Sequence, residues 1–224
     1  MPFLIFLKSF EVLLYEIMSW LVFYPRTLWR ATRHPLRMMK RSEQELKLPA
    51  ADQFKDLVSP PIFLLLTVLA AHGFEIVLVG NSPIIDNGIG LASLVQDNTS
   101  LVMFRLIAFA TLPVISAAFG VAATRQPLDR VTLQPLFYAQ CFATTPVVLL
   151  CSVASSVSRL PQDVSDKAAD LMLAAAAVCY IGVEAAWFSR EAKRGPVIGS
   201  LWALAAFALS ALVLAAMTLL FAGT

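Results

Sequence analysis

The chain has 224 residues, of which 58% are hydrophobic, and its mean hydropathy is +0.74. A water-soluble domain of this length is less apolar, so the composition excludes that class and indicates an integral membrane protein. The formal net charge of +2 points to no class of partner. The positions of the charges along the chain therefore carry more information than their sum.

The first segment, residues 3–24, is predicted to form an amphipathic helix that lies in the membrane interface. Its polar side chains fall on one side of a helical wheel: Lys8, Glu11, Glu16 and Ser19. The other side is apolar: Phe3, Phe6, Phe10, Leu13, Leu14, Ile17 and Leu21. This segregation is typical of a helix with one face in lipid and the other among headgroups. A helix packed on the protein's own cytosolic face is the alternative.

A basic segment follows. Its cations recur in steps of three or four residues and form one stripe on a helix, with one more adjoining: Arg26, Arg30, Arg33, Arg37, Lys40 and Arg41. Pro35 disfavours helix at His34, so we expect the segment to divide into two short helices. Six cations beside a membrane segment fall in the range that binds anionic lipid headgroups. Charge that only sets the topology is the alternative. Nucleic acid is disfavoured as a partner, because Glu43 and Asp52 follow closely.

Five long apolar stretches make up the rest of the chain. Ser59 is a suitable N-cap and Pro60 a suitable first helical residue, so the first stretch has a defined start. Each stretch is about 20 residues or longer, which is enough to cross the hydrocarbon core. The predicted transmembrane helices cover approximately residues 60–79, 101–123, 134–157, 169–188 and 196–221.

The predicted fold is therefore all-α, with five transmembrane helices preceded by a cytosolic amphipathic and basic helical segment. Residues 1–58 form the interfacial region, and residues 59–224 form the five-helix bundle. Nine basic residues precede Ser59, whereas residues 80–100 contain none. Placing the N-terminus in the cytoplasm puts fourteen basic residues on that side and two on the other, with Arg105 inside a span. The positive-inside rule favours this orientation, with the C-terminus on the opposite side.

Three ionisable side chains fall within the first two spans. His72 and Glu75 lie three residues apart and share one helix face. The first span ends on the outer side of the membrane, and the second span begins there. Arg105 lies about one turn into the second span, so its depth should match that of Glu75. We expect Glu75 and Arg105 to pair. The pair is either purely structural or, together with His72, a site for a solute or a proton.

A second polar site involves the third and fourth spans. Glu184 either reaches the cytosolic headgroups by snorkelling or meets Gln140. No metal is expected at His72 and Glu75, because they supply only two ligands and the other histidine, His34, lies on the cytosolic side. No nucleophile motif is present either. We therefore expect neither an enzyme nor a cofactor.

Short motifs near the start of the chain carry a resemblance to a known family. They are Phe23-Tyr24-Pro25-Arg26 with Leu28, Trp29 and Arg30, the His34-Pro35 step, and Ser59-Pro60-Pro61-Ile62-Phe63-Leu64. With these motifs and a cytosolic region ahead of five spans, the chain resembles the YIP-type family of five-span membrane proteins, in particular its bacterial permease-like branch. The resemblance implies a bacterial inner-membrane protein with a periplasmic C-terminus, acting as a membrane organiser or permease, and supplies no catalytic residues.

Two functional hypotheses follow. In the first, the protein is a non-enzymatic organiser or scaffold, whose residues 1–58 bind anionic lipid at the membrane surface. In the second, it is a small permease whose path involves His72, Glu75 and Arg105. The alanine-rich fourth and fifth spans allow close helix approach, so homo-oligomers or complexes with other membrane proteins are possible in either case.

Overall fold

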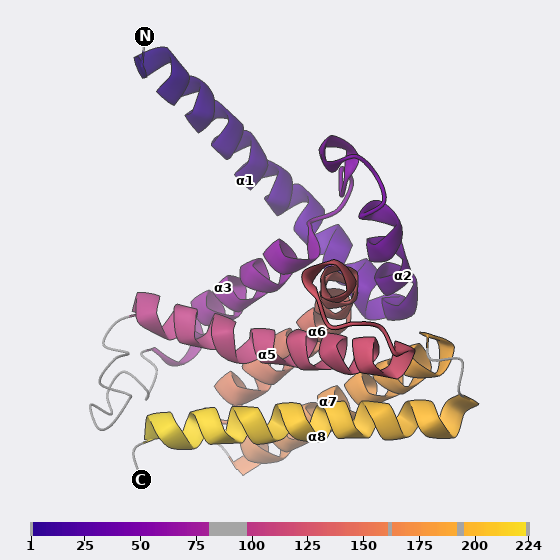
Figure 1. Ribbon diagram of the computed structural model, residues 1–224. Coiled ribbons are helices and arrows are strands. Elements are labelled where there is room, and N and C mark those ends of the chain that lie inside the picture. The colour runs from indigo at the N-terminus through magenta and orange to yellow at the C-terminus, as the bar shows by residue number, and fades with distance from the viewer. Residues whose placement is uncertain (1, 81–97, 161–162, 192–194, 223–224) are drawn as a thin grey trace.

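The computed structural model describes residues 2–80, 98–160, 163–191 and 195–222, and every regular element within these ranges is helical. The predicted all-α fold is confirmed to that extent. Figure 1 shows the elements in chain order: α1 (Pro2–Arg33), α2 (Pro35–Glu45), the 3₁₀ helix η1 (Ala50–Asp52), α3 (Pro60–Val79), α5 (Asn98–Thr124), α6 (Arg130–Val157), α7 (Asp163–Glu191) and α8 (Gly195–Ala222).

Five of these helices, α3 and α5 to α8, are long and apolar enough to cross a membrane, as in a multi-pass membrane protein. Their bounds agree with the predicted spans to within six residues, and the observed helices are never the shorter ones. In α6, the extra length brings the helix to a capped end. At the start of α6, the Asp129 side chain accepts a hydrogen bond from the Thr132 amide at 2.8 Å, within a capping box.

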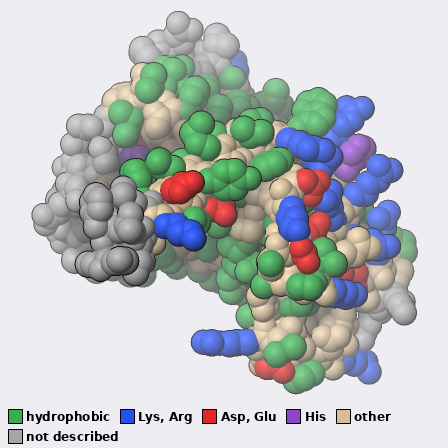
Figure 2. Space-filling view, turned by 90° about the horizontal axis from the view of Figure 1, so that it is seen from above, with side chains coloured by type: hydrophobic (Ala, Val, Ile, Leu, Met, Phe, Trp, Pro, Cys, Tyr) green, Lys and Arg blue, Asp and Glu red, His purple; other side chains and the backbone are tan. Residues whose placement is uncertain are grey.

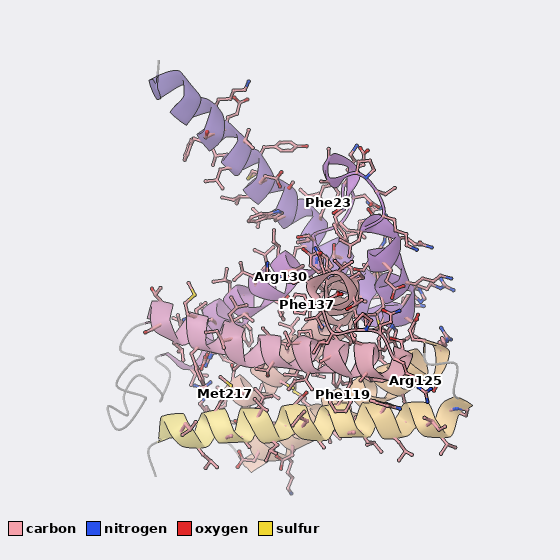
Figure 3. All side chains as sticks on the ribbon, in the orientation of Figure 1. Phe23, Phe119, Arg125, Arg130, Phe137 and Met217 are labelled. Carbon is pink, nitrogen blue, oxygen red and sulfur yellow. The ribbon has the colours of Figure 1, made fainter. Side chains whose placement is uncertain are left out.

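Helix α6 is the centre of the bundle and contacts α1, α2, α3, α5 and α7. On its other side, α7 packs against α8, and α8 also contacts α5. In Figure 3, Phe119 lies between α5 and α8, where its ring packs edge-on against Trp202 at a centroid distance of 5.8 Å. We call the end of the bundle where α3 begins the α2 end, because α2 packs there. The opposite end is the Glu75 end.

Small residues let the helices approach closely. A Cβ at Gly120 of α5 would lie 2.8 Å from the Trp187 ring of α7. A Cβ at Gly199 of α8 would lie 2.7 Å from the backbone nitrogen of Ser189 on α7. Both separations are below van der Waals contact, so a larger side chain would force the helices apart. Close packing by small residues is thus used within the bundle itself.

Helix α1 is one continuous helix of 32 residues, which runs through Pro25 and ends before His34. The predicted break at His34 is confirmed: this residue takes φ −137° and ψ 58°, outside the helical region, because of the proline that follows. The prediction of two short helices is wrong for the first helix, which is long. Pro25 does not divide it, so the amphipathic segment and the basic residues up to Arg33 lie on one continuous helix.

The two halves of α1 differ in their packing. Residues 8–18 are all exposed, and Figure 1 shows this half projecting away from the bundle. The second half is anchored, since Ala31 joins a buried cluster with Leu57, Val58 of the α2–α3 connection, Phe63 of α3 and Phe142 of α6. Within the amphipathic segment 3–24, Phe23 and Tyr24 pack against this cluster, as one of the two alternatives predicted, whereas residues 8–18 do not pack on the protein's own surface.

Candidate functional site

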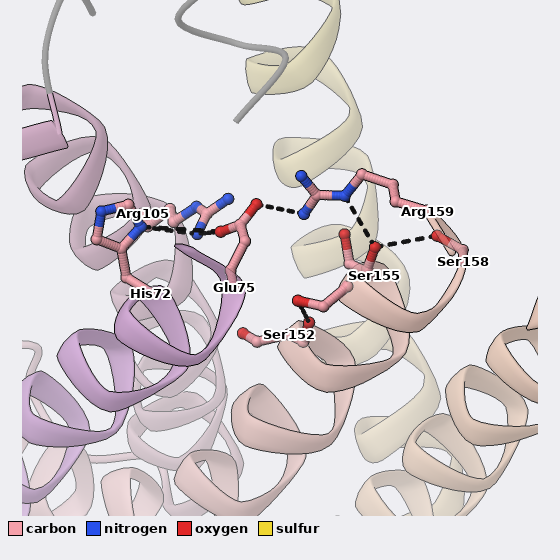
Figure 4. Close-up of polar contacts among 8 residues, drawn as sticks. His72, Glu75, Arg105, Ser152, Ser155, Ser158 and Arg159 are labelled. Atoms are coloured by element: carbon pink, nitrogen blue, oxygen red, sulfur yellow. Dashed lines mark hydrogen bonds and ion pairs between the residues drawn. The ribbon is translucent and has the colours of Figure 1, made fainter. Parts of the chain in front are cut away.

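The first polar site, the Glu75 cluster, consists of His72, Glu75, Arg105 and Arg159 (Figure 4). Glu75 is only 2% exposed, yet both of its carboxylate oxygens are paired. Arg105 of α5 binds Oε2 through Nη1, and Arg159 binds Oε1 through Nη2. The expected pair between Glu75 and Arg105 is therefore present, and a second arginine completes it. Two guanidinium groups against one carboxylate leave the cluster with an excess of one positive charge.

His72 completes the cluster from the same face of α3 as Glu75. Its Nδ1 lies 3.3 Å from Nη1 of Arg105 and 3.8 Å from Oε2 of Glu75. A guanidinium group cannot accept a hydrogen bond, so Arg105 must be the donor and Nδ1 the acceptor. The ring is then the neutral tautomer with its proton on Nε2. That nitrogen is buried and has no hydrogen-bond partner among the described residues.

Arg159 is the member of the cluster that the sequence did not predict, because it lies beyond the predicted third span, 134–157. It comes two residues after Val157, the last residue of α6, and its side chain turns back, so that Nε donates to the carbonyl oxygen of Ser155 at 3.1 Å. The signal was available in the alternation of the spans. The end of α3, the start of α5 and the end of α6 must all lie at one end of the bundle, where Arg159 is the first cation after the third span.

The second polar site, the Glu184 cluster, lies between α5, α6 and α7. Its members are each at most 1% exposed: Ser116, Gln140, Thr144, Tyr180 and Glu184. Nε2 of Gln140 donates to Oε2 of Glu184 at 3.1 Å, so these two residues meet as one alternative predicted. The other alternative, snorkelling of Glu184 to the headgroups, is wrong, because α6 and α5 cover this face of α7.

The hydroxyl groups of this cluster were not predicted. The Ser116 and Tyr180 hydroxyls lie 2.9 Å apart and join α5 to α7. Helical spacing was the available signal, since Tyr180 and Glu184 are four residues apart, as are Gln140 and Thr144. Gln140 and Arg159 are separated by roughly 28 Å along the axis of α6. The two clusters therefore cannot bind one small ligand together.

The six basic residues of the N-terminal region divide into two groups. Asp56 accepts a hydrogen bond from Arg41 at 2.6 Å and lies 3.5 Å from Arg30, and Arg41 also bonds Glu45 at 3.2 Å. The predicted single stripe is therefore reduced, because the chain after α2 brings Asp56 back against it. The other four are exposed and form no ion pair within the described ranges: Arg26, Arg33, Arg37 and Lys40. Figure 2 shows Lys and Arg side chains gathered towards one end of the molecule.

Asp56 is held ionised by its partners. Burial raises the pKa of its carboxyl group, but the hydrogen bond and the charge of Arg41 lower it, with a smaller contribution from Arg30. The net result is a pKa below the ordinary value for aspartate. The charge of Asp56 therefore ties α1 and α2 together at neutral pH.

Two neighbouring hollows lie beside α1 and share Trp20. The larger, of about 520 Å³, is formed with residues 50–62 and has polar groups from Glu16, Ser19 and Lys55. The smaller, of about 280 Å³, lies against α3 and is lined almost entirely by apolar side chains, including Leu66. The first hollow is thus partly polar beside the α2–α3 connection, and the second is apolar along α3.

Within the described part of the chain, no group of three or more His, Cys, Asp or Glu side chains could hold a metal ion. Comparison of the chain with protein-family models, curated proteins and solved structures finds no match. The resemblance to the YIP-type family therefore stays a prediction, and the residues that bear on function are those of the two clusters and of the N-terminal region.

Proposed function

We propose that the protein is a multi-pass protein of a bacterial inner membrane that organises lipid or partner proteins at the cytosolic surface. Residues 1–58 would act as a platform that binds anionic lipid. The observation that carries this proposal is the set of exposed cations on α1 and α2 that form no ion pair within the described ranges: Arg26, Arg33, Arg37 and Lys40. Each such charge near an anionic membrane surface contributes about 1 kcal/mol.

The position of these cations supports the proposal. The second half of α1 is anchored to α3 through Phe63 and through a hydrogen bond of 2.9 Å between the Tyr24 and Thr67 hydroxyls. The four cations are therefore fixed beside the end of the bundle where α3 begins. Arg125, Arg130 and Arg190 belong to connections or helix ends at this same end. An excess of basic residues at one end is the pattern of the cytosolic side.

The two hollows beside α1 give further support. The apolar hollow contacts α3 at Leu66 and Ala70, and the partly polar hollow lies at the level where α3 begins. A glycerophospholipid has the same division between acyl chains and headgroup. Residues 8–18, which nothing in the described chain covers, would then contact the surrounding lipid.

The test uses the purified full-length protein in a neutral detergent. It is equilibrated with an equal mixture of phosphatidylglycerol and phosphatidylcholine, and the lipid that remains bound is quantified by mass spectrometry. We expect the wild type to be enriched in phosphatidylglycerol, in a manner that salt weakens. A variant with Arg26, Arg33, Arg37 and Lys40 changed to Gln should lose the enrichment.

Two matched controls make this test specific. Changing the same three arginines to Lys keeps the charge and should keep the enrichment. Lys55→Gln removes a nearby charge that Asp52 already pairs, and should change little. Equal enrichment in the wild type and in the four-fold Gln variant would contradict the platform.

A permease is a second candidate function, and the Glu75 cluster is the observation that favours it. A buried carboxylate with two arginines and a neutral histidine offers donors in excess of acceptors, which suits an anionic solute. If the cluster handles a solute, Glu75→Gln and Arg105→Gln should fold normally while flux into proteoliposomes disappears. If both variants lose folded yield, and a Glu75→Arg, Arg105→Glu double variant recovers some of it, the cluster is structural.

A further inference from the structure

Glu184 is a buried carboxyl group without a cation beside it. It is 1% exposed and lies on α7, where α6 contributes its hydrogen-bond partner Gln140. From α5, Ser116 reaches Tyr180, a titratable group one turn away on α7 itself, and Cys141 of α6 lies near Tyr180. Helix α8 has no charged residue in 195–222, and Glu43 of α2 lies near Glu191 at the α2 end.

An ionised Glu184 would therefore be an uncompensated charge. Within the described ranges, no Lys, Arg or His forms an ion pair or a hydrogen bond with it. Transfer of an isolated carboxylate from water to such surroundings is unfavourable, and a carboxyl group avoids the cost by taking up a proton. Glu75 shows the other solution in the same bundle, because two arginines compensate its charge.

The hydrogen bonds of the cluster also favour the neutral form. Glu184 accepts one hydrogen bond, from Nε2 of Gln140 to Oε2. Three further oxygens are buried and have no partner in the described structure: Oε1 of Glu184, Oε1 of Gln140 and Oγ1 of Thr144. A carboxylate and an amide oxygen can only accept, so an ionised Glu184 leaves the oxygen of Gln140 unmatched. A proton on Oε1 of Glu184 supplies the missing donor.

We propose that Glu184 is a proton-binding site within the bundle, loaded in the folded protein at neutral pH. The carboxylate takes a proton from water to give the neutral acid, with the new O–H bond on Oε1 and Oε2 still bonded to Gln140. The proton is then donated to Oε1 of Gln140 or to Oγ1 of Thr144. Release of the proton would place a charge between α6 and α7 and weaken their contact.

Infrared spectroscopy of the full-length protein in detergent tests this directly. A protonated carboxyl group has a C=O stretching band that an ionised one lacks. The difference spectrum between wild type and Glu184→Gln at neutral pH should contain this band in the wild type alone. Glu16→Gln, which removes an exposed carboxylate of α1, should leave the band in place. A difference spectrum without the band would overturn the proposal.

Stability against pH gives a second readout. A proton that the folded state keeps and the unfolded state releases makes the protein less stable as pH rises above the ordinary range of glutamate. Glu184→Gln should remove that part of the dependence. The measurement is repeated with choline in place of sodium. If stability and the infrared band both follow sodium, a metal cation occupies the site and the proposal is wrong.

Gln140→Leu keeps the proposal testable if Glu184→Gln does not fold. It retains Glu184 but removes its amide partner. The infrared band should then persist at a higher wavenumber, because the C=O group has lost the hydrogen bond from Nε2. Replacement of the band by carboxylate absorption would show that Glu184 is ionised, against the proposal.

Discussion

Glu75 and Glu184 are the same residue type at nearly the same burial, 2% and 1% exposed, but the bundle accommodates them in opposite ways. Glu75 lies between two arginines near one end, so its charge is compensated. Glu184 has a neutral amide as its hydrogen-bond partner. Burial alone therefore does not fix the state of a carboxyl group. The partners that the neighbouring helices bring to it decide whether charge or neutrality is the less costly form.

Among these changes, removing the charge of Glu75 should lower the free energy of unfolding the most. Glu75→Gln leaves two buried guanidinium groups without a counter-charge, and the loss of one partner from such a network costs about 3 kcal/mol of unfolding free energy. Unfolding of the purified protein by a denaturing detergent measures it. Glu16→Gln, on the exposed part of α1, is the matched control and should change nothing.

Removing one arginine should cost less than removing the carboxylate. Arg159→Gln leaves Glu75 paired with Arg105, so the expected loss is that of one hydrogen bond to a charged group, about 2 kcal/mol. The loss should not add to that of Glu75→Gln, because both changes break the same contact. Full additivity in the double variant would show that Arg159 stabilises the protein in some other way.

The hydroxyl pair of the Glu184 cluster should have an intermediate effect. Tyr180→Phe leaves the Ser116 hydroxyl buried without its partner and should cost about 1 kcal/mol. Adding Ser116→Ala should cost little more, since the orphaned group is then gone. Tyr15→Phe makes the same chemical change at a side chain that is 73% exposed, and should leave stability unaltered.

Glu184→Gln should have a smaller effect, within about 1 kcal/mol at neutral pH, because a neutral amide replaces a neutral acid of similar shape. This small change in stability is what distinguishes Glu184 from Glu75. A loss as large as that of Glu75→Gln would remove the contrast between the two carboxyl groups.

Asp56 forms a similar ion pair at the surface, and its loss should lower the free energy of unfolding the least. It is paired with Arg41 as Glu75 is with Arg105, but its side chain is 42% exposed, so solvent screens the pair. Its pKa is lowered in the folded state, so the stabilisation is present above the ordinary aspartate range and is lost as pH falls through the lowered pKa.

This pH effect appears as the difference in unfolding free energy between wild type and Asp56→Asn. The difference should be constant near neutral pH, shrink in acid and become smaller in high salt. Arg41→Gln should shift the acid transition upward, whereas Arg26→Gln, which removes an exposed charge elsewhere on α1, should leave it in place. An acid transition that Arg41→Gln does not move would contradict the pairing.

The sequence by itself determined the features that depend on near neighbours in the chain. Hydropathy gave the five spans, and Pro35 gave the break after α1, because both act over a few residues. The order of the spans also predicted the pair of Glu75 and Arg105, since the alternation of spans fixes the depth of each charge. The sequence could not give the unbroken passage of α1 through Pro25, because propensity is only a local preference.

Only the tertiary structure decided which side chains meet across the bundle. Arg159 pairs with Glu75, and the Ser116 hydroxyl meets that of Tyr180. Asp56 forms ion pairs with two of the six cations that were expected to bind lipid. These contacts depend on how the helices are rotated about their axes and ordered in space. Hydropathy fixes neither property, since a helix that is apolar on most sides satisfies it at any rotation. The close packing of small residues and the pairing of buried polar groups select one arrangement.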